Sequence, residues 1–262
     1  MHRLPAALLA VSALAACSTF GGGQQAVDTT GAVQGARPVD RQARERVGRE
    51  DMLTQMAFWA GEYQTFPNDL EAAQRFSEAL RKGGRIDRAA QIAGEAIGRF
   101  PADRQLLTTY GLAQIASARP QEALQPLTLV AEAEPDNWRV RSALGAALDQ
   151  LGRFSEARLA YQEALALQPN DPRILTNLGV SHIMAGEPAD AEPILRQAAG
   201  LPNAPAEARQ NLAIALALQG RFDEAEQIER VDLPPAQAAQ NIEYLRGLLS
   251  DPRRWGDVGR PG

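Results

Sequence analysis

The stretch from Trp138 to Asp171, WRVRSALGAALDQLGRFSEARLAYQEALALQPND, decides the fold of this chain. Gly145 and Ala157 are small enough for two helices to cross there at close range. Gly152 can adopt the left-handed conformation that ends a first helix. Pro169 would stop a second helix, because it lacks an amide hydrogen and restricts the residue before it. The stretch therefore predicts two helices joined by a tight turn.

The same unit recurs along the chain with a fixed period. Four prolines stand 34 residues apart, namely Pro67, Pro101, Pro135 and Pro169. In this frame, units begin at Leu70, Arg104, Trp138, Pro172 and Ala206. The third unit resembles the tetratricopeptide repeat at Leu144, Gly145, Leu148, Gly152, Ala157, Tyr161, Ala164 and Pro169. The resemblance implies an all-α solenoid of about five helix-turn-helix repeats, each of which buries its apolar face against its neighbours.

The ends of such a solenoid need capping helices, and residues 50–250 contain a candidate at each end. Before the first repeat, apolar residues follow helical spacing at Met52, Met56, Trp59 and Tyr63. After the last repeat, Pro234 and Pro235 can start a helix whose apolar face carries Ala238, Ile242, Leu245 and Leu249. Residues 251–262 read as a loose C-terminal tail, in which Trp255 would pack back on the cap or touch a partner.

The first sixteen residues have the pattern of a bacterial export signal, with a positive start and an apolar stretch from Leu4 to Leu14. Eleven helical residues span ~17 Å, which is too short for the ~30 Å core of a bilayer. Leu14-Ala15-Ala16-Cys17 resembles the lipobox of bacterial lipoproteins. The resemblance implies cleavage before Cys17 and acylation of that residue with chains such as palmitate. An ordinary secretory signal is the alternative.

Residues 17–49 are expected to form the lipidated amino terminus and a flexible tether, because Gly, Gln, Ala, Thr and charged residues dominate them without an apolar period. Ser18 stands where retention signals for the inner membrane often place Asp. By analogy with lipoproteins, this favours the bacterial outer membrane, with the array facing the periplasm.

Composition and motifs argue against several classes of function. The net charge of -5 and the pI near 5.2 disfavour a nucleic-acid partner. We find no phosphate-binding glycine loop, no His-Glu-x-x-His and no Cys/His metal spacing in the sequence. His182 is expected to be a partly buried histidine with a polar partner. We therefore expect no enzyme, cofactor, metal site or small-molecule substrate.

In tetratricopeptide arrays, the first helices of the repeats line a concave groove, and the resemblance places specific residues there. The candidate protein-binding residues are Leu112, Ile115, Arg139, Asp149, Gln150, Asn177, Val180, Ile183, Met184, Asn211, Ile214 and Leu218. Most of them are apolar, so an amphipathic helix or an apolar segment is the expected ligand. The alternative is that these side chains pack against the tail, the cap or neighbouring helices.

The region from Ala208 to Leu249 is similar to the TadD family, the tetratricopeptide lipoproteins of tight-adherence (Flp) pilus systems. Its most specific segments are Asp232-Leu233-Pro234-Pro235 and Asn241-Ile242-Glu243-Tyr244-Leu245. The resemblance implies a pilotin, a lipoprotein that helps the secretin of the pilus machine reach the outer membrane and assemble. A general periplasmic adaptor for cell-envelope enzymes or outer-membrane assembly components is the alternative.

Overall fold

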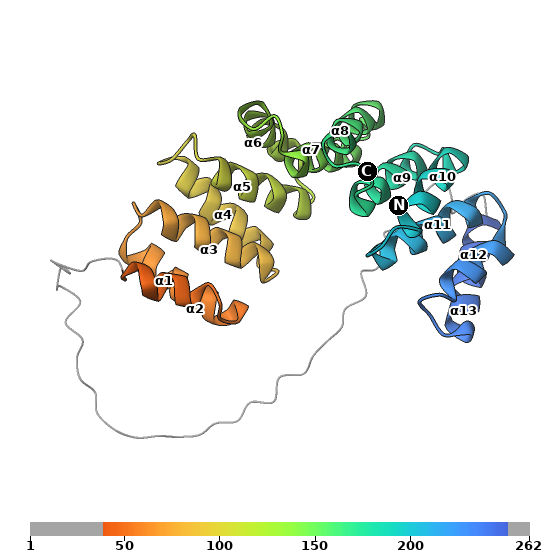
Figure 1. The fold of residues 1–262 in the computed structure, drawn as a ribbon, viewed down its shortest axis with the longest axis horizontal. Coiled ribbons are helices and arrows are strands. Elements are labelled where there is room, and N and C mark those ends of the chain that lie inside the picture. The colour runs from red at the N-terminus through yellow and green to blue at the C-terminus, as the bar shows by residue number, and fades with distance from the viewer. Residues whose placement is uncertain (1–38, 251–262) are drawn as a thin grey trace, which may run out of the picture. The chain divides into compact units, whose positions relative to one another are not determined.

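The computed structural model describes residues 39–250 (Figure 1). The signal segment, Cys17 and Trp255 lie outside the described residues. Within that range the chain is helical and has no strand. The helices are α1 (Arg41–Val47), α2 (Met52–Thr65), α3 (Leu70–Lys82), α4 (Ile86–Ile97), α5 (Arg104–Ala116), α6 (Pro120–Ala133), α7 (Trp138–Gln150), α8 (Phe154–Leu167), α9 (Pro172–Met184), α10 (Pro188–Ala199), α11 (Ala206–Leu218), α12 (Phe222–Glu229) and α13 (Pro235–Ser250).

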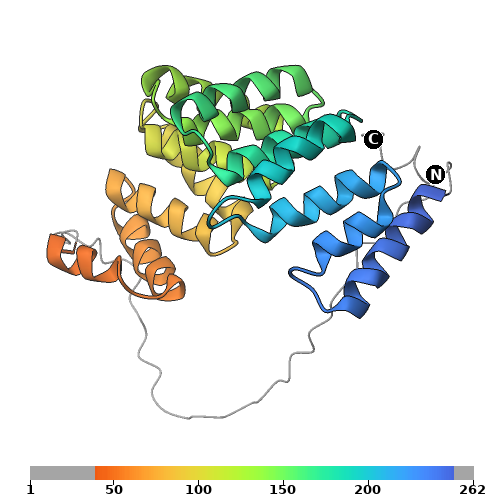
Figure 2. The same ribbon diagram turned by 45° about the vertical axis from the view of Figure 1, so that its right-hand side comes forward.

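Five helix pairs form the repeats expected from the sequence: α3 with α4, α5 with α6, α7 with α8, α9 with α10, and α11 with α12. The pairs follow one another in chain order (Figure 2). Within residues 39–250, each helix packs only on the next helix or on the next but one. The contacts of the second kind join first helices of neighbouring repeats, from α3 to α5 and onward to α11, and they join α11 to the capping helix α13. The predicted α-solenoid is therefore confirmed.

In three of the pairs, a large side chain of the second helix packs directly against a glycine of the first helix. A Cβ atom on Gly145 would lie 2.6 Å from the ring of Tyr161, which is too close for any real contact. Gly111 meets Leu127 and Gly179 meets Leu195 in the same way. The close approach expected at Gly145 is thus present, and the side chain that fills it is Tyr161.

The turn between the two helices of a repeat needs a residue with positive φ. Glycine supplies it in four repeats, for example Gly152 with φ 71°. In the second repeat the same place is taken by Ala118, whose φ is 55°. Positive φ is sterically unfavourable for alanine, because its Cβ crowds the backbone. The turn at Ala118 is therefore more strained than the turns of the other four repeats.

The two ends carry the expected capping helices, α2 and α13, but the first end differs from expectation in one respect. Helix α1 lies within residues 17–49, for which the sequence predicts a tether. Asp40 caps α1 by accepting a hydrogen bond from the amide of Ala43, and Arg44 is buried. The helix is held by charged contacts, which an apolar periodicity does not reveal.

None of the helices between residues 39 and 250 combines the length and the apolar character that crossing a bilayer requires.

Candidate protein-binding surface

Neighbouring first helices form a continuous layer, because α5 packs on α7, α7 on α9 and α9 on α11. Leu112, Val180 and Ile214 occupy the same position of their respective helices, and each remains partly exposed. Side chains at equivalent positions of adjacent helices face the same side of the layer. The layer therefore presents a row of partly exposed apolar side chains to whatever lies beside it.

Ile183 and Leu218 line an apolar pocket of about 500 Å³ between the last two repeats and the capping helix. Its walls are Ile183, Gly186, Pro188, Ala217, Leu218, Gly220, Phe222 and Leu249. Ile115 occupies the position of Ile183 in the second repeat, where it is partly buried against the core. The structure thus brings two of the predicted groove residues into one recess.

The other predicted groove residues differ in how much surface they offer. Arg139 is exposed, and its guanidinium lies 4.3 Å from the ring centroid of Trp138. Met184 is also exposed, and Gln150 is exposed while its amide donates to the carbonyl of Ile115. Asn177 and Asn211 are partly buried. These side chains add polar and flexible contacts to the apolar row.

Asp149 does not belong to the exposed surface, although the family pattern places it there. It is 6% exposed, and it accepts hydrogen bonds from Tyr161 at 2.9 Å and from Ser181 at 2.6 Å. Burial raises the pKa of Asp149, while the two hydroxyl donors oppose that shift. The burial and the nearby carboxylate also raise the pKa of Tyr161. Asp149 therefore joins the third and fourth repeats instead of meeting a ligand.

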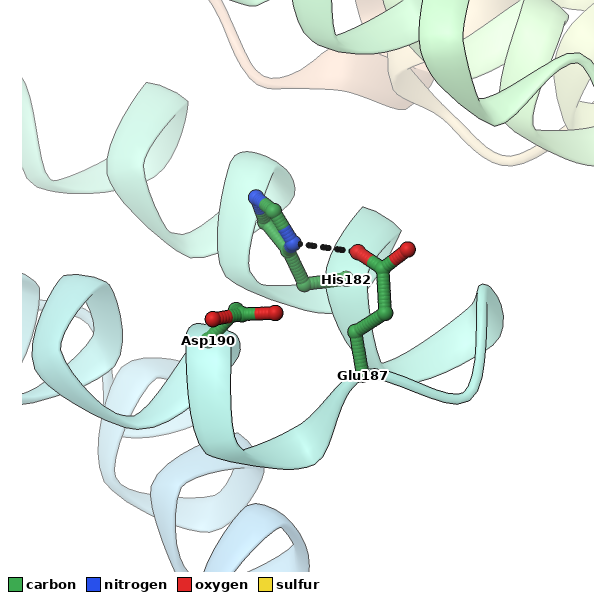
Figure 3. Close-up of side chains that lie close together, drawn as sticks. All are labelled: His182, Glu187 and Asp190. Atoms are coloured by element: carbon green, nitrogen blue, oxygen red, sulfur yellow. Dashed lines mark hydrogen bonds and ion pairs between the residues drawn. The ribbon is translucent and has the colours of Figure 1, made fainter.

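His182, Glu187 and Asp190 gather at the turn between α9 and α10 (Figure 3). Nδ1 of His182 lies 2.8 Å from Oε2 of Glu187. Candidate ligand atoms of the three residues lie within 4.8 Å of one another, a spacing that a metal ion could bridge. Arg158, however, donates to the same oxygen of Glu187 at 2.9 Å. The cluster thus already contains a cation, and its geometry is that of a structural contact between repeats.

A second charged cluster closes the first end of the array, and sequence reasoning did not identify it. Arg44 lies 2.6 Å from Glu62, 2.5 Å from Asp69 and 2.9 Å from Glu71. Its guanidinium also lies over Trp59, 5.5 Å from the ring centroid. The hydrogen bond to Asp69, followed by those to the other two carboxylates, raises the pKa of Arg44. The residues concerned are 18 to 27 positions apart, so no local sequence pattern links them.

Comparison with protein-family models supports the repeat assignment. A TPR repeat model matches residues 145–186, and a Tetratricopeptide repeat model matches residues 182–250. These ranges contain the second part of α7 and every helix from α8 to α13.

Curated relatives and a solved structure agree with the family models. The chain is 35% identical over 123 residues to the TPR repeat-containing protein PA4667 of Pseudomonas aeruginosa, covering 47% of this chain and 21% of that protein. It is 31% identical over 120 residues to y4yS of Sinorhizobium fredii, covering 46% of this chain and 65% of that protein. The chain thus spans less than two thirds of each relative.

A solved structure of MamA (MSR-1) aligns with a TM-score of 0.52 and 30% identity, over 60% of this chain and 89% of MamA. Tetratricopeptide repeats are typical of scaffolds that bind other proteins, which agrees with the layer of partly exposed first-helix side chains. Repeat geometry, family models and solved structures together identify the chain as a member of the tetratricopeptide-repeat proteins.

Proposed function

We propose that this chain is a lipid-anchored scaffold that binds the secretin of a tight-adherence pilus machine and helps it assemble at the outer membrane. The observation that carries the proposal is the row of partly exposed apolar side chains at Leu112, Val180 and Ile214. An amphipathic segment could bury its apolar face against this row while keeping its polar face in water. Such a contact would shield a segment that otherwise aggregates.

Two sequence features support the membrane and pilus parts of the proposal. Leu14-Ala15-Ala16-Cys17 resembles a lipobox, and the residues from Asp232 to Leu245 resemble the TadD family. A single acyl chain holds a protein only marginally at a bilayer, whereas several chains give a stable anchor. An acylated scaffold would therefore carry its bound segment to the membrane in which the secretin assembles.

The anchor is tested by replacing Cys17 with Ser in cells that make the pilus. We expect the scaffold to leave the outer-membrane fraction and the secretin to lose its ring assemblies or its location. Membrane fractionation and the heat-resistant secretin multimer are the readouts. Normal secretin rings at the outer membrane in Cys17→Ser cells would contradict the pilotin role.

The binding surface is tested separately with Val180→Asp and Ile214→Asp in the acylated protein. A charge in the apolar row should lower secretin recovery in a pull-down by at least about tenfold, because an unpaired carboxylate would be buried against the ligand. Leu159→Asp is the matched control, since Leu159 is 60% exposed on the second helix α8. Equal secretin recovery with all three variants would remove the first-helix layer as the binding site.

Recovery of envelope enzymes without secretin would instead favour the general adaptor. That result would leave the scaffold role standing and would remove the pilus assignment.

A further inference from the structure

The apolar pocket between α9, α11 and α13 lies directly where the described chain ends. Leu249, one of its lining residues, precedes the last described residue, Ser250. The segment that follows, Asp251 to Gly262, contains one aromatic residue, Trp255. Trp255 stands six residues after Leu249, so an extended chain could carry it up to about 20 Å from that residue. The pocket is therefore within its reach.

Bulky apolar residues at a comparable place in the repeats offer a guide to where Trp255 lies. In the third, fourth and fifth repeats, Phe154, Pro188 and Phe222 each stand four residues after the end of the first helix. Pro188 and Phe222 both line the pocket. Helix α13 takes the place of a first helix after the fifth repeat, because it packs on α11 as α11 packs on α9. Trp255 stands five residues after the end of α13, one position later than in the repeats.

The residue before the aromatic extends the similarity. Arg153 precedes Phe154 and Arg221 precedes Phe222, and in the same way Arg254 precedes Trp255. The chain thus repeats the step from arginine to an aromatic residue once more after the last complete repeat. In the fifth repeat, that step places Phe222 beside Gly186 and Pro188 of the fourth repeat.

We propose that Trp255 occupies the pocket formed by Ile183, Leu218, Phe222 and Leu249. The volume of about 500 Å³ is sufficient for an indole ring with a neighbouring backbone segment. Charge also fits, because Arg253 and Arg254 directly precede Trp255, while the exposed Asp190 and Asp223 lie close in sequence to Pro188 and Phe222. A buried tryptophan preceded by two cations would anchor residues 251–262 on the array.

The docked segment has a consequence for binding. It covers Ile183 and Leu218, two of the residues expected to meet a partner. Any ligand that uses this end of the first-helix layer must displace Trp255, so the chain carries its own competitor. This inference concerns contacts within one chain, and it holds whether or not the partner is a secretin.

Fluorine NMR of the acyl-free Cys17→Ser protein, labelled with 5-fluorotryptophan, tests the docking. Trp59, Trp138 and Trp255 give three resonances, and Trp255→Phe assigns the third. We expect the chemical shift of Trp255 to differ from that of free 5-fluorotryptophan in the unaltered pocket. In Ile183→Asp, the resonance should move to the chemical shift of the free amino acid. Ile115→Asp is the matched control, because Ile115 holds the same position in the second repeat and should leave the resonance in place.

A Trp255 resonance at the free position in the unaltered pocket would overturn the proposal. A shifted resonance that returns to the free position on dilution would assign Trp255 to the pocket of a second copy, which also overturns docking within one chain.

Limited trypsin digestion gives a second readout that does not depend on the pocket variant being folded. Docking protects the bonds after Arg253 and Arg254, since cleavage requires the segment to leave the pocket. We expect Trp255→Ala to speed cleavage at these bonds by at least about fivefold, with mass spectrometry locating the products. Equal cleavage rates in the unaltered protein and in Trp255→Ala would show that Trp255 does not hold residues 251–262 on the array.

Discussion

The two ends of the array are closed by different chemistry. At the first end, α1 lies against α2 and α3 through Arg44, whose guanidinium contacts Glu62, Asp69 and Glu71. At the other end, α13 packs on α11 and α12 through Ala238 and Ile242, which are 0% and 2% exposed. At the first end an ionic cluster adds to the apolar packing of Trp59, Tyr63 and Val47, whereas apolar packing holds α13 at the other end.

This difference affects both stability and binding. Ion pairs respond to pH and salt, whereas apolar packing responds little to either. The apolar end also carries surface that no described residue covers, since the pocket beside Leu249 lies there and Tyr244 is 68% exposed. The contacts of α1 at the first end should therefore respond to pH and salt. The second end is the more suitable place for an apolar ligand.

The largest expected effect is the loss of the ionic closure in Arg44→Ala. Glu62, whose side chain is 7% exposed, would keep a buried charge without its partner. Removing one member of a buried ion pair costs about 3–5 kcal/mol. We expect α1 and α2 to lose hydrogen-exchange protection while α9 to α13 keep theirs. Arg41→Ala is the control on the same helix, because the Arg41 side chain is 91% exposed.

Unchanged protection of α1 and α2 in Arg44→Ala would mean that apolar contacts hold both ends alike.

The apolar closure is weakened by Ile242→Ala. Deleting a fully buried isoleucine side chain costs about 2–5 kcal/mol. We expect α13 to lose hydrogen-exchange protection to the same extent at low and high salt, because no ion pair is involved. Tyr244→Ala, on the exposed side of α13, should change the free energy of unfolding by less than about 0.5 kcal/mol. A strong salt dependence of the Ile242→Ala effect would break the contrast between the ends.

Acid should loosen the first end selectively. Burial alone would raise the pKa of Asp69, but the hydrogen bond from Arg44 and the amide of Ala72 hold that pKa below its ordinary value. The resulting stabilisation is present above the ordinary pKa of about 3.9 and is lost as the pH falls through the lower folded value. Protection factors of α1 and α2 should therefore decrease below about pH 4, and those of α13 should not. A parallel decrease at both ends would contradict this prediction.

The smallest expected effect lies between the ends, in the strained turn of the second repeat. Ala118→Gly should stabilise the chain by about 0.5–1 kcal/mol, since glycine adopts positive φ without a steric cost. The reciprocal change, Gly152→Ala, should destabilise the third repeat by about 1 kcal/mol. Urea unfolding midpoints measure both changes. If Ala118→Gly raises the midpoint and Gly152→Ala lowers it, the two changes give the cost of a positive-φ alanine within the repeats. The effects of the variants at the two ends can then be compared with that value.

The repeat architecture could be predicted from the sequence because its signals are local. Gly152 and Pro169 mark a turn and a helix end, and their recurrence gives the period of the array. Helix α1 could not be predicted in this way, because Arg44 finds its carboxylate partners in other helices and loops. A lone arginine in a polar segment gives no sign that three acidic residues will surround it.

The exposure of the candidate binding residues was predicted less well than the fold, and Asp149 shows the reason. A position rule places Asp149 on the exposed layer, but Tyr161 from the same repeat and Ser181 from the next one satisfy its carboxylate inside the array. Exposure depends on which polar partners the neighbours supply, and a rule based on one repeat cannot include them. Apolar residues such as Val180 have no such partners, so the rule places them more reliably.

The packing of each helix on only its nearest two neighbours has a mechanical consequence. If the chain is pulled from its ends, the load passes through a series of small interfaces, with no contact between distant repeats of residues 39–250 to share it. Extension would then proceed by successive release of single helix pairs, each adding a similar length. Such a molecule would lengthen in steps under tension and could remain attached while its outermost modules yield.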